Sequence, residues 1–101
     1  MFERSVIYLI SKSPDPRGFT DPIVESQRMV YCTVRSVGHT EVYEAMTHGL
    51  RPTLVFRLAN YLDYGDESYC EYDGKRYRII RTYRAGMTID LTVEEAEDVL
   101  S

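Results

Sequence analysis

Apolar and polar residues alternate in several short segments of the chain, which is the period-two pattern of half-buried β-strands. The clearest example lies between residues 26 and 37, where Val30, Cys32 and Val34 fall on one side of an extended chain. The pattern predicts six strands, at residues 4–12, 26–37, 53–62, 68–72, 75–83 and 87–92. Two of them meet at Asp73-Gly74, the dipeptide favoured in a two-residue type I′ hairpin.

One segment has helical periodicity instead, and it separates the second strand from the third. The spacing predicts a helix over residues 41–48, with Thr40 as its N-cap and Gly49 as the left-handed residue that ends it. Three apolar residues share one face of this helix, namely Val42, Ala45 and Met46. We expect this stripe to cover one end of the β core.

These elements predict a mainly β protein, a small antiparallel β-barrel or sandwich of about six strands with one short α-helix between strands 2 and 3. At 101 residues the chain has room for one hydrophobic core, so we assign residues 1–101 to a single domain with its core in residues 4–92. Residues 93–101 form an acidic C-terminal tail. Thr92 and Glu95 fit a capping box that starts a short helix, and a solvated terminus fits the same residues.

Composition and motifs narrow the range of functions. The chain has 16 acidic and 12 basic residues and a formal net charge of −4, so its average field repels nucleic acid and anionic membranes. Its two cysteines have neither zinc nor redox spacing, and His39 and His48 are too far apart to share a helical face as metal ligands. The sequence contains no nucleophile motif and no apolar stretch of membrane-spanning length. We therefore expect no enzymatic activity, no metal, no cofactor and no membrane partner.

Three pieces of the chain together resemble one protein family: SVGHTEVYEAMTHGLRP at residues 36–52, YCEYDGKRYRIIRTYR at residues 69–84, and the ending IDL at residues 89–91. With the order of strands, loop and helix from about Val6 to Thr92, they make the chain similar to the head-closure proteins of tailed bacteriophages. These are also called head-completion, stopper or head-tail joining proteins. The resemblance implies a non-enzymatic structural protein of the virion, located at the head-tail interface and assembled in the bacterial host cytoplasm.

The resemblance also implies partners. The protein would form a homo-oligomeric ring, six-fold or twelve-fold, that closes the portal channel after DNA packaging and serves as the platform for tail attachment. Its neighbours would be the portal adaptor protein and a tail-side connector or tail-terminator protein, and double-stranded DNA would pass through the lumen without sequence-specific binding. Two alternatives stay open: another connector ring protein, such as a tail-side joining or tail-terminator protein, and a cellular OB-like or SH3-like module that binds nucleic acid or a peptide.

Residues 13–23 form a long connection, rich in proline, between the first two strands. It exceeds the usual length of about four to six residues, and unusually long loops often have a function. The resemblance implies that such a loop points into the central channel, where several copies around the ring would close it. Its expected contact residues are Arg17, Phe19, Thr20 and Asp21.

The run KRYRIIRTYR at residues 75–84 is both basic and aromatic, a composition that suits binding of phosphates and bases and is also found in amphipathic strands. Simple alternation places Tyr77, Ile79, Arg81 and Tyr83 on one face, so neither face is purely basic. We expect the arginines of one subunit to pair with the acidic tail of its neighbour, and the helix to contact a neighbour as well. The expected subunit contacts are Tyr43, Met46, Arg76, Arg78, Arg81, Glu94 and Glu95.

Overall fold

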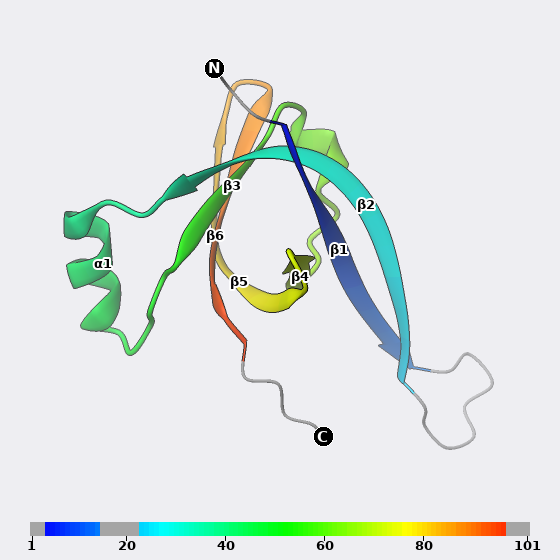
Figure 1. Ribbon diagram of the computed structural model, residues 1–101, viewed down its shortest axis with the longest axis horizontal. Helices are drawn as coiled ribbons and strands as arrows, with labels where there is room; N and C mark the ends of the chain where they lie inside the picture. Colours follow the sequence, from blue (N-terminus) through cyan, green and yellow to red (C-terminus); the bar gives the residue numbers. More distant parts are fainter. Residues whose placement is uncertain (1–3, 15–22, 97–101) are drawn as a thin grey trace.

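The computed structural model describes residues 4–14 and 23–96, and it places them in a closed barrel of six antiparallel strands (Figure 1). The elements are β1 (Ser5–Pro14), β2 (Ile23–Ser36), α1 (His39–Met46), β3 (Leu54–Leu58), the 3-10 helix η1 (Tyr61–Asp63), β4 (Tyr69–Tyr72), β5 (Lys75–Ala85) and β6 (Thr88–Glu95). Around the barrel the strands follow the order β1-β2-β3-β6-β5-β4, and β4 closes it by pairing with β1. The predicted fold class is confirmed, as a barrel with one short helix between the second and third strands.

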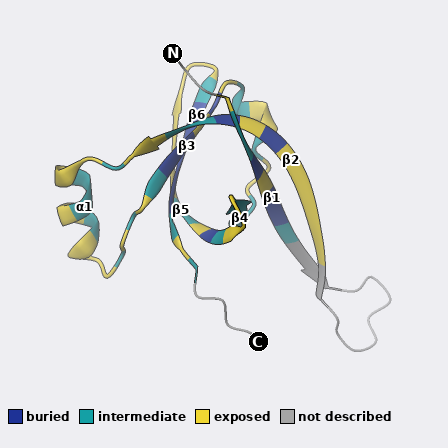
Figure 2. Cartoon of the chain, in the orientation of Figure 1, coloured by how far each residue is buried: buried dark blue, intermediate teal, exposed yellow. Residues whose placement is uncertain are grey.

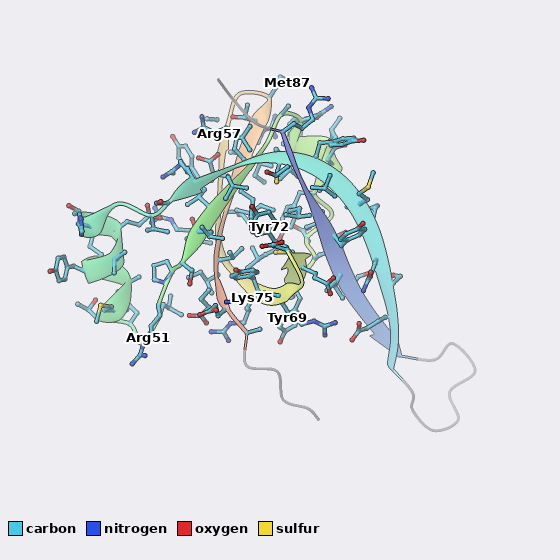
Figure 3. The ribbon with its side chains drawn as sticks, viewed as in Figure 1. Arg51, Arg57, Tyr69, Tyr72, Lys75 and Met87 are labelled. Carbon is cyan, nitrogen blue, oxygen red and sulfur yellow. The ribbon has the colours of Figure 1, made fainter. Side chains whose placement is uncertain are left out.

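The barrel interior is filled by the inward side chains of the alternating strands. Phe56 lies at its centre, fully buried, with its ring 5.2 Å from that of Tyr72 and 6.1 Å from that of Tyr77. Tyr72 points into the space enclosed by the strands in Figure 3. The other fully buried members of this core cluster are Ile7, Leu9, Leu58, Cys70, Leu91 and Val93. Each large apolar side chain buried in this way contributes roughly 1.5 to 3 kcal/mol to stability, so this cluster holds the fold together.

The turn between β4 and β5 has the predicted conformation. Asp73 and Gly74 both have positive φ, at 52° and 79°, as a type I′ turn requires. Asp tolerates the left-handed region because its short polar side chain can bond locally, and glycine has no Cβ to clash.

The end of α1 is also as predicted, whereas its beginning is not. Gly49 has φ of 76°, and the N–H groups of Gly49 and Leu50 donate to the carbonyls of Met46 and Ala45, both at 3.0 Å, which is a Schellman motif. The expected N-cap, Thr40, is wrong, because the helix starts at His39 with Gly38 as a cap that makes no side-chain hydrogen bond. The helix forms from Gly38 because the carbonyl of Gly38 already accepts the N–H of Val42 at 3.0 Å.

The helix does not cover an end of the barrel, contrary to expectation. Figure 1 shows α1 beside the wall near β3, and none of its residues is buried. In the expected apolar stripe, Val42 and Ala45 are half-buried and Met46 is exposed. Because β2 and β3 are neighbours in the barrel, the connection that carries α1 stays beside that part of the wall.

The acidic residues after Thr92 continue β6 and start no helix. Glu94 lies opposite Arg78 and Glu95 opposite Tyr77 in the ladder between β6 and β5. The predicted capping-box helix is therefore wrong for Glu94 and Glu95, because the long β5 offers them backbone partners, and Glu95 remains exposed to solvent at the end of β6. Residues 97–101 lie outside the described part of the chain.

A β-bulge at Ile80 changes which side chains of β5 face outward. Ile79 pairs with Val93 and Arg81 with Thr92, so Ile80 has no partner of its own in β6. Beyond this point the predicted faces are exchanged, because the extra residue shifts the alternation by one. Arg81 consequently faces outward with Arg78 and does not share a face with the buried Tyr77.

The β1–β2 hairpin extends beyond the barrel as a two-stranded ribbon (Figure 1). β1 pairs with β4 only over Tyr8–Ile10, and β2 pairs with β3 only from Thr33, so nearer the hairpin tip the two strands pair only with each other. The principal dimensions of 46 × 30 × 24 Å reflect this shape. Strand pairing includes Pro14 and Ile23, both expected in the long loop, and residues 15–22 lie outside the described residues.

Candidate assembly surfaces

The helix α1 carries Tyr43, which has the highest exposed fraction among the large hydrophobic side chains of the described residues. Tyr43 is 71% exposed and Met46 54% exposed, as Figure 2 illustrates for the helix as a whole. A groove of about 280 Å³ separates α1 from the barrel, and its apolar part is lined by Ala45, Leu50, Pro52 and Ile80. Across it, the hydroxyl of Thr92 donates to a carboxylate oxygen of Glu41 at 3.4 Å. The helix therefore touches the barrel lightly and leaves an apolar face open.

The arginines of β5 are paired within the chain. Arg76 donates two hydrogen bonds to Glu25, at 3.1 and 3.2 Å, and Arg78 forms an ion pair with Glu94. Lys75 forms another with Glu95, at 3.2 Å. Arg78 and Glu94 already pair within one chain, because β5 and β6 are adjacent in one barrel, and the expected contact of this basic strand with the acidic residues of a neighbouring subunit stays a prediction.

Arg81 differs from these residues. It is exposed on the outer side of β5, and among the described residues it has no ion-pair partner. It lines the groove beside α1 together with His48. Among the three β5 arginines expected at a subunit contact, Arg81 is therefore the one whose guanidinium is available to a neighbouring subunit.

Sequence reasoning missed a second cluster of charges, on the outer faces of β3 and β6. Asp90 is only 8% exposed, and its carboxylate accepts hydrogen bonds from Arg57 at 2.7 and 3.1 Å, while Arg35 lies 3.8 Å away. The hydrogen bonds from Arg57 are the main cause that lowers the pKa of Asp90; burial opposes them, and the charges of both arginines add to them. Detecting this cluster requires knowing that β3 and β6 are neighbours, which no local pattern indicates.

Two more carboxylates hold the ends of strands in place. Burial raises the pKa of Glu94, but hydrogen bonds from the backbone N–H of Arg51, at 3.0 Å, and from Arg78 outweigh it, so the pKa is lowered. Burial acts on Glu67 in the same way and is outweighed mainly by Arg28, at 2.7 Å. These two carboxylates thus neutralise Arg78 and Arg28 at the barrel surface.

Exposed apolar side chains also gather on the ribbon and at one end of the barrel. Tyr8, Met29 and Tyr31 alternate outward on β1 and β2, with Tyr8 directly opposite Met29. At the barrel end, η1 is joined to the β5–β6 turn by the N–H of Tyr61, which donates to the carbonyl of Met87 at 2.7 Å. Figure 3 shows Met87 at the end opposite Lys75.

The remaining candidate groups have no reactive arrangement among residues 4–14 and 23–96. Burial raises the pKa of Cys32 to about 11 and that of Cys70 to about 12, so both thiols are protonated at neutral pH. In this part of the chain no cluster of His, Cys, Asp and Glu has the arrangement of a metal site, and no helix has the length and apolarity to cross a membrane. The expected gating residues Arg17, Phe19, Thr20 and Asp21 lie outside the described residues.

No protein-family model matches the chain, and a comparison with curated proteins gives no match either.

Proposed function

We propose that the chain is a structural subunit of the head-tail connector of a tailed bacteriophage, a stopper or head-closure protein that assembles into a ring. In this role it closes the portal channel after DNA packaging and offers the platform to which the tail attaches. The sequence resemblance described above supports the proposal, as does a small barrel with a helix between β2 and β3. The small barrel and the position of its helix are the two features of the fold that the resemblance implies.

The observation that carries the proposal is the unburied helix. An isolated helix shorter than about 12 residues is marginal in water, and most helices gain their stability by packing an apolar face. α1 has eight residues, buries none of them and exposes Tyr43 and Met46. A neighbouring subunit seated on this face would bury both side chains and supply the packing that the barrel does not.

Assembly in solution tests the role of this face. We expect the purified chain to form a closed oligomer at high concentration, measured by native mass spectrometry, and a Tyr43→Asp/Met46→Lys variant to stay monomeric with an unchanged circular dichroism spectrum. Leu62→Asp is the matched control, because Leu62 is equally exposed but lies on η1. A helix variant that assembles like the unmodified protein would exclude α1 from the interface.

The connector role itself is tested on particles. Phage assembled without this protein should contain DNA-filled heads that lose their DNA or fail to join tails, seen by negative-stain microscopy and by nuclease sensitivity of the DNA. Filled, tailed and stable particles would rule the role out.

A further inference from the structure

The β2 strand has a long backbone edge without a partner. β3 pairs with β2 only from Thr33 onward, and β3 ends at Leu58 before the chain turns into η1. Between Ser26 and Tyr31, no other described segment forms backbone hydrogen bonds with β2 on this side. In an antiparallel strand every second residue points its N–H and C=O to the same side, so this edge carries a row of unpaired donors and acceptors.

A hollow of about 550 Å³ lies along the end of this edge nearest the barrel. Six consecutive residues of β2, Arg28–Thr33, line it, together with Ala59 and Asp63 from the segment that follows β3. Because side chains of a strand alternate between faces, such a run can line one hollow only along the backbone edge. The hollow therefore lies beside β2 at the place where β3 has ended and the chain has turned into η1.

In a chain of net charge −4, the side chains that line the hollow carry more positive than negative charge, with Arg4, Arg28 and Arg57 against the carboxylate of Asp63. The carboxylates of Glu67 and Asp90, which pair with Arg28 and Arg57, lie outside this lining. Arg4 stacks over the ring of Tyr31 at 5.4 Å and has no carboxylate partner among the described residues. The guanidinium side chains of Arg28 and Arg57 are about half exposed although each is paired on its other side. All three can accept a further carboxylate.

We propose that the open edge of β2 between Ser26 and Tyr31 binds an extended, acidic segment of a partner protein, which joins the sheet as an additional strand. The edge supplies hydrogen bonds to the partner backbone, the three arginines pair with its acidic side chains, and the exposed Met29 and Tyr31 take up apolar ones. This inference concerns a partner site on the isolated chain and does not depend on the connector role.

A peptide fits the edge better than a nucleic acid does. A peptide strand offers alternating donors and acceptors, which match those of β2, whereas a phosphodiester backbone has only acceptors and would leave the carbonyls unpaired. A second copy of the chain also fits less well. Its acidic strand residues Glu71, Glu94 and Glu95 lie in β4 and β6, each of which pairs with a strand on both sides, and two copies of the β2 edge would bring their arginines together.

The test uses synthetic peptides on the intact chain. The probe is an acetylated and amidated octapeptide in which Glu alternates with Val, and two matched peptides carry Lys in place of Glu or an N-methyl group on every residue, which blocks both edges of the strand. We expect the acidic peptide to bind at least about tenfold more tightly than either control, because losing a few hydrogen bonds or the charge match costs that much affinity. Amide hydrogen exchange should slow at alternate residues between Ser26 and Tyr31.

Substitutions locate the site. Arg4→Gln should weaken binding of the acidic peptide about two- to fivefold, as expected for one exposed ion pair. Arg81→Gln is the control, because Arg81 is also exposed and lies on β5 away from the hollow, and it should leave binding unchanged. Circular dichroism verifies that both variants are folded.

Several results would overturn the proposal. These are absence of binding by the acidic peptide at millimolar concentration, equal binding of the acidic and lysine peptides, or full binding by the N-methylated one. Tighter binding of oligothymidylate would assign the hollow to nucleic acid. Self-association of the chain that protects the same alternate amides would assign the edge to a second copy.

Discussion

The barrel wall formed by β3, β6 and β5 differs sharply from the two parts that project from it, the β1–β2 ribbon and α1. β6 pairs with both β3 and β5, and its inward side chains Ile89, Leu91 and Val93 are buried. The outer part of β2 and the helix have the reverse character: residues 25–29 are all exposed, and α1 has no buried residue, whereas β1 still contributes Ile7, Leu9 and Ile10 to the buried set. The same chain thus contains a well-packed core and two segments whose side chains remain largely exposed to solvent.

This difference indicates where stability and interaction reside. A marginally stable domain of about 100 residues has roughly 5 to 15 kcal/mol to lose, and buried contacts supply most of it. Segments that bury little can change with small effects on folding, so their exposed side chains are available for partners. Substitutions that affect either the free energy of unfolding or assembly, but not both, therefore test the difference between the barrel wall and the exposed segments.

The largest effect is expected in the core. Phe56→Ala should lower the free energy of unfolding by about 3 to 5 kcal/mol, because it leaves a cavity between the rings of Tyr72 and Tyr77. Tyr43→Ala on α1 removes a comparably large ring and should change the same quantity by less than about 0.5 kcal/mol. Urea unfolding followed by circular dichroism measures both. Equal losses would show that α1 belongs to the cooperative core.

The next effect concerns the charge cluster on the barrel wall. Asp90→Asn should lower the free energy of unfolding by about 1 to 3 kcal/mol at neutral pH, because the hydrogen bonds from Arg57 lose their charged acceptor. Glu44→Gln on α1 is the control and should have little effect, because Glu44 is exposed and its carboxylate forms no hydrogen bond with any other described residue.

We also expect the stability difference between the unmodified protein and the Asp90→Asn variant to depend on pH. Since the pKa of Asp90 is lower in the folded than in the unfolded chain, its contribution is complete above its ordinary value of 3.8 and is lost as the pH falls toward the lowered value. The unmodified protein should therefore lose more stability than Asp90→Asn on acidification below about pH 4. Parallel acid-titration curves for the two proteins would contradict the lowered pKa.

A smaller, local effect is expected at the end of α1. Gly49→Ala places a Cβ at φ of 76° and should destabilise the last turn by about 1 kcal/mol. Because α1 buries nothing, we expect faster hydrogen exchange in the helix with unchanged protection in β6. Loss of protection throughout the barrel would mean that helix and barrel unfold together.

The smallest effect is expected where the two regions touch. Thr92→Val removes the 3.4 Å hydrogen bond to Glu41 while keeping the shape of the side chain, so the change in unfolding free energy should stay near 0.5 kcal/mol or below. Thr53→Val is a comparable hydroxyl deletion away from α1. A loss of more than about 1.5 kcal/mol at Thr92 alone would show that this contact fixes the helix.

Local patterns were sufficient for the strands, the Asp73-Gly74 turn and the Schellman end of α1, because each depends on a few neighbouring residues. They failed where distant segments decide. The bulge at Ile80 follows from fitting β5 against β6, and the strand conformation of Glu94 follows from pairing with Arg78. The sequence indicated that basic residues such as Arg78 would pair with acidic residues such as Glu94. It did not indicate that the two lie on neighbouring strands of one chain, where the structure brings them together.

The helix position and the open β2 edge could not be predicted for a related reason. The first depends on β2 and β3 being neighbours, and the second on β3 ending at Leu58 inside the segment expected to continue to residue 62. A sequence reports where a strand is favourable, but the length over which it pairs depends on its neighbour. The open β2 edge arises from such a mismatch in length, and the helix position arises from which strands are neighbours.

The filled interior of the barrel sets a condition on any connector assembled from this chain. With Phe56, Tyr77 and their neighbours in contact across it, a barrel of six strands leaves no bore of its own. Any conduit for DNA in such an assembly must run between subunits, with its width set by how many copies close the circle and its lining drawn from their outward side chains. In that arrangement each barrel is a solid part of the wall around the conduit.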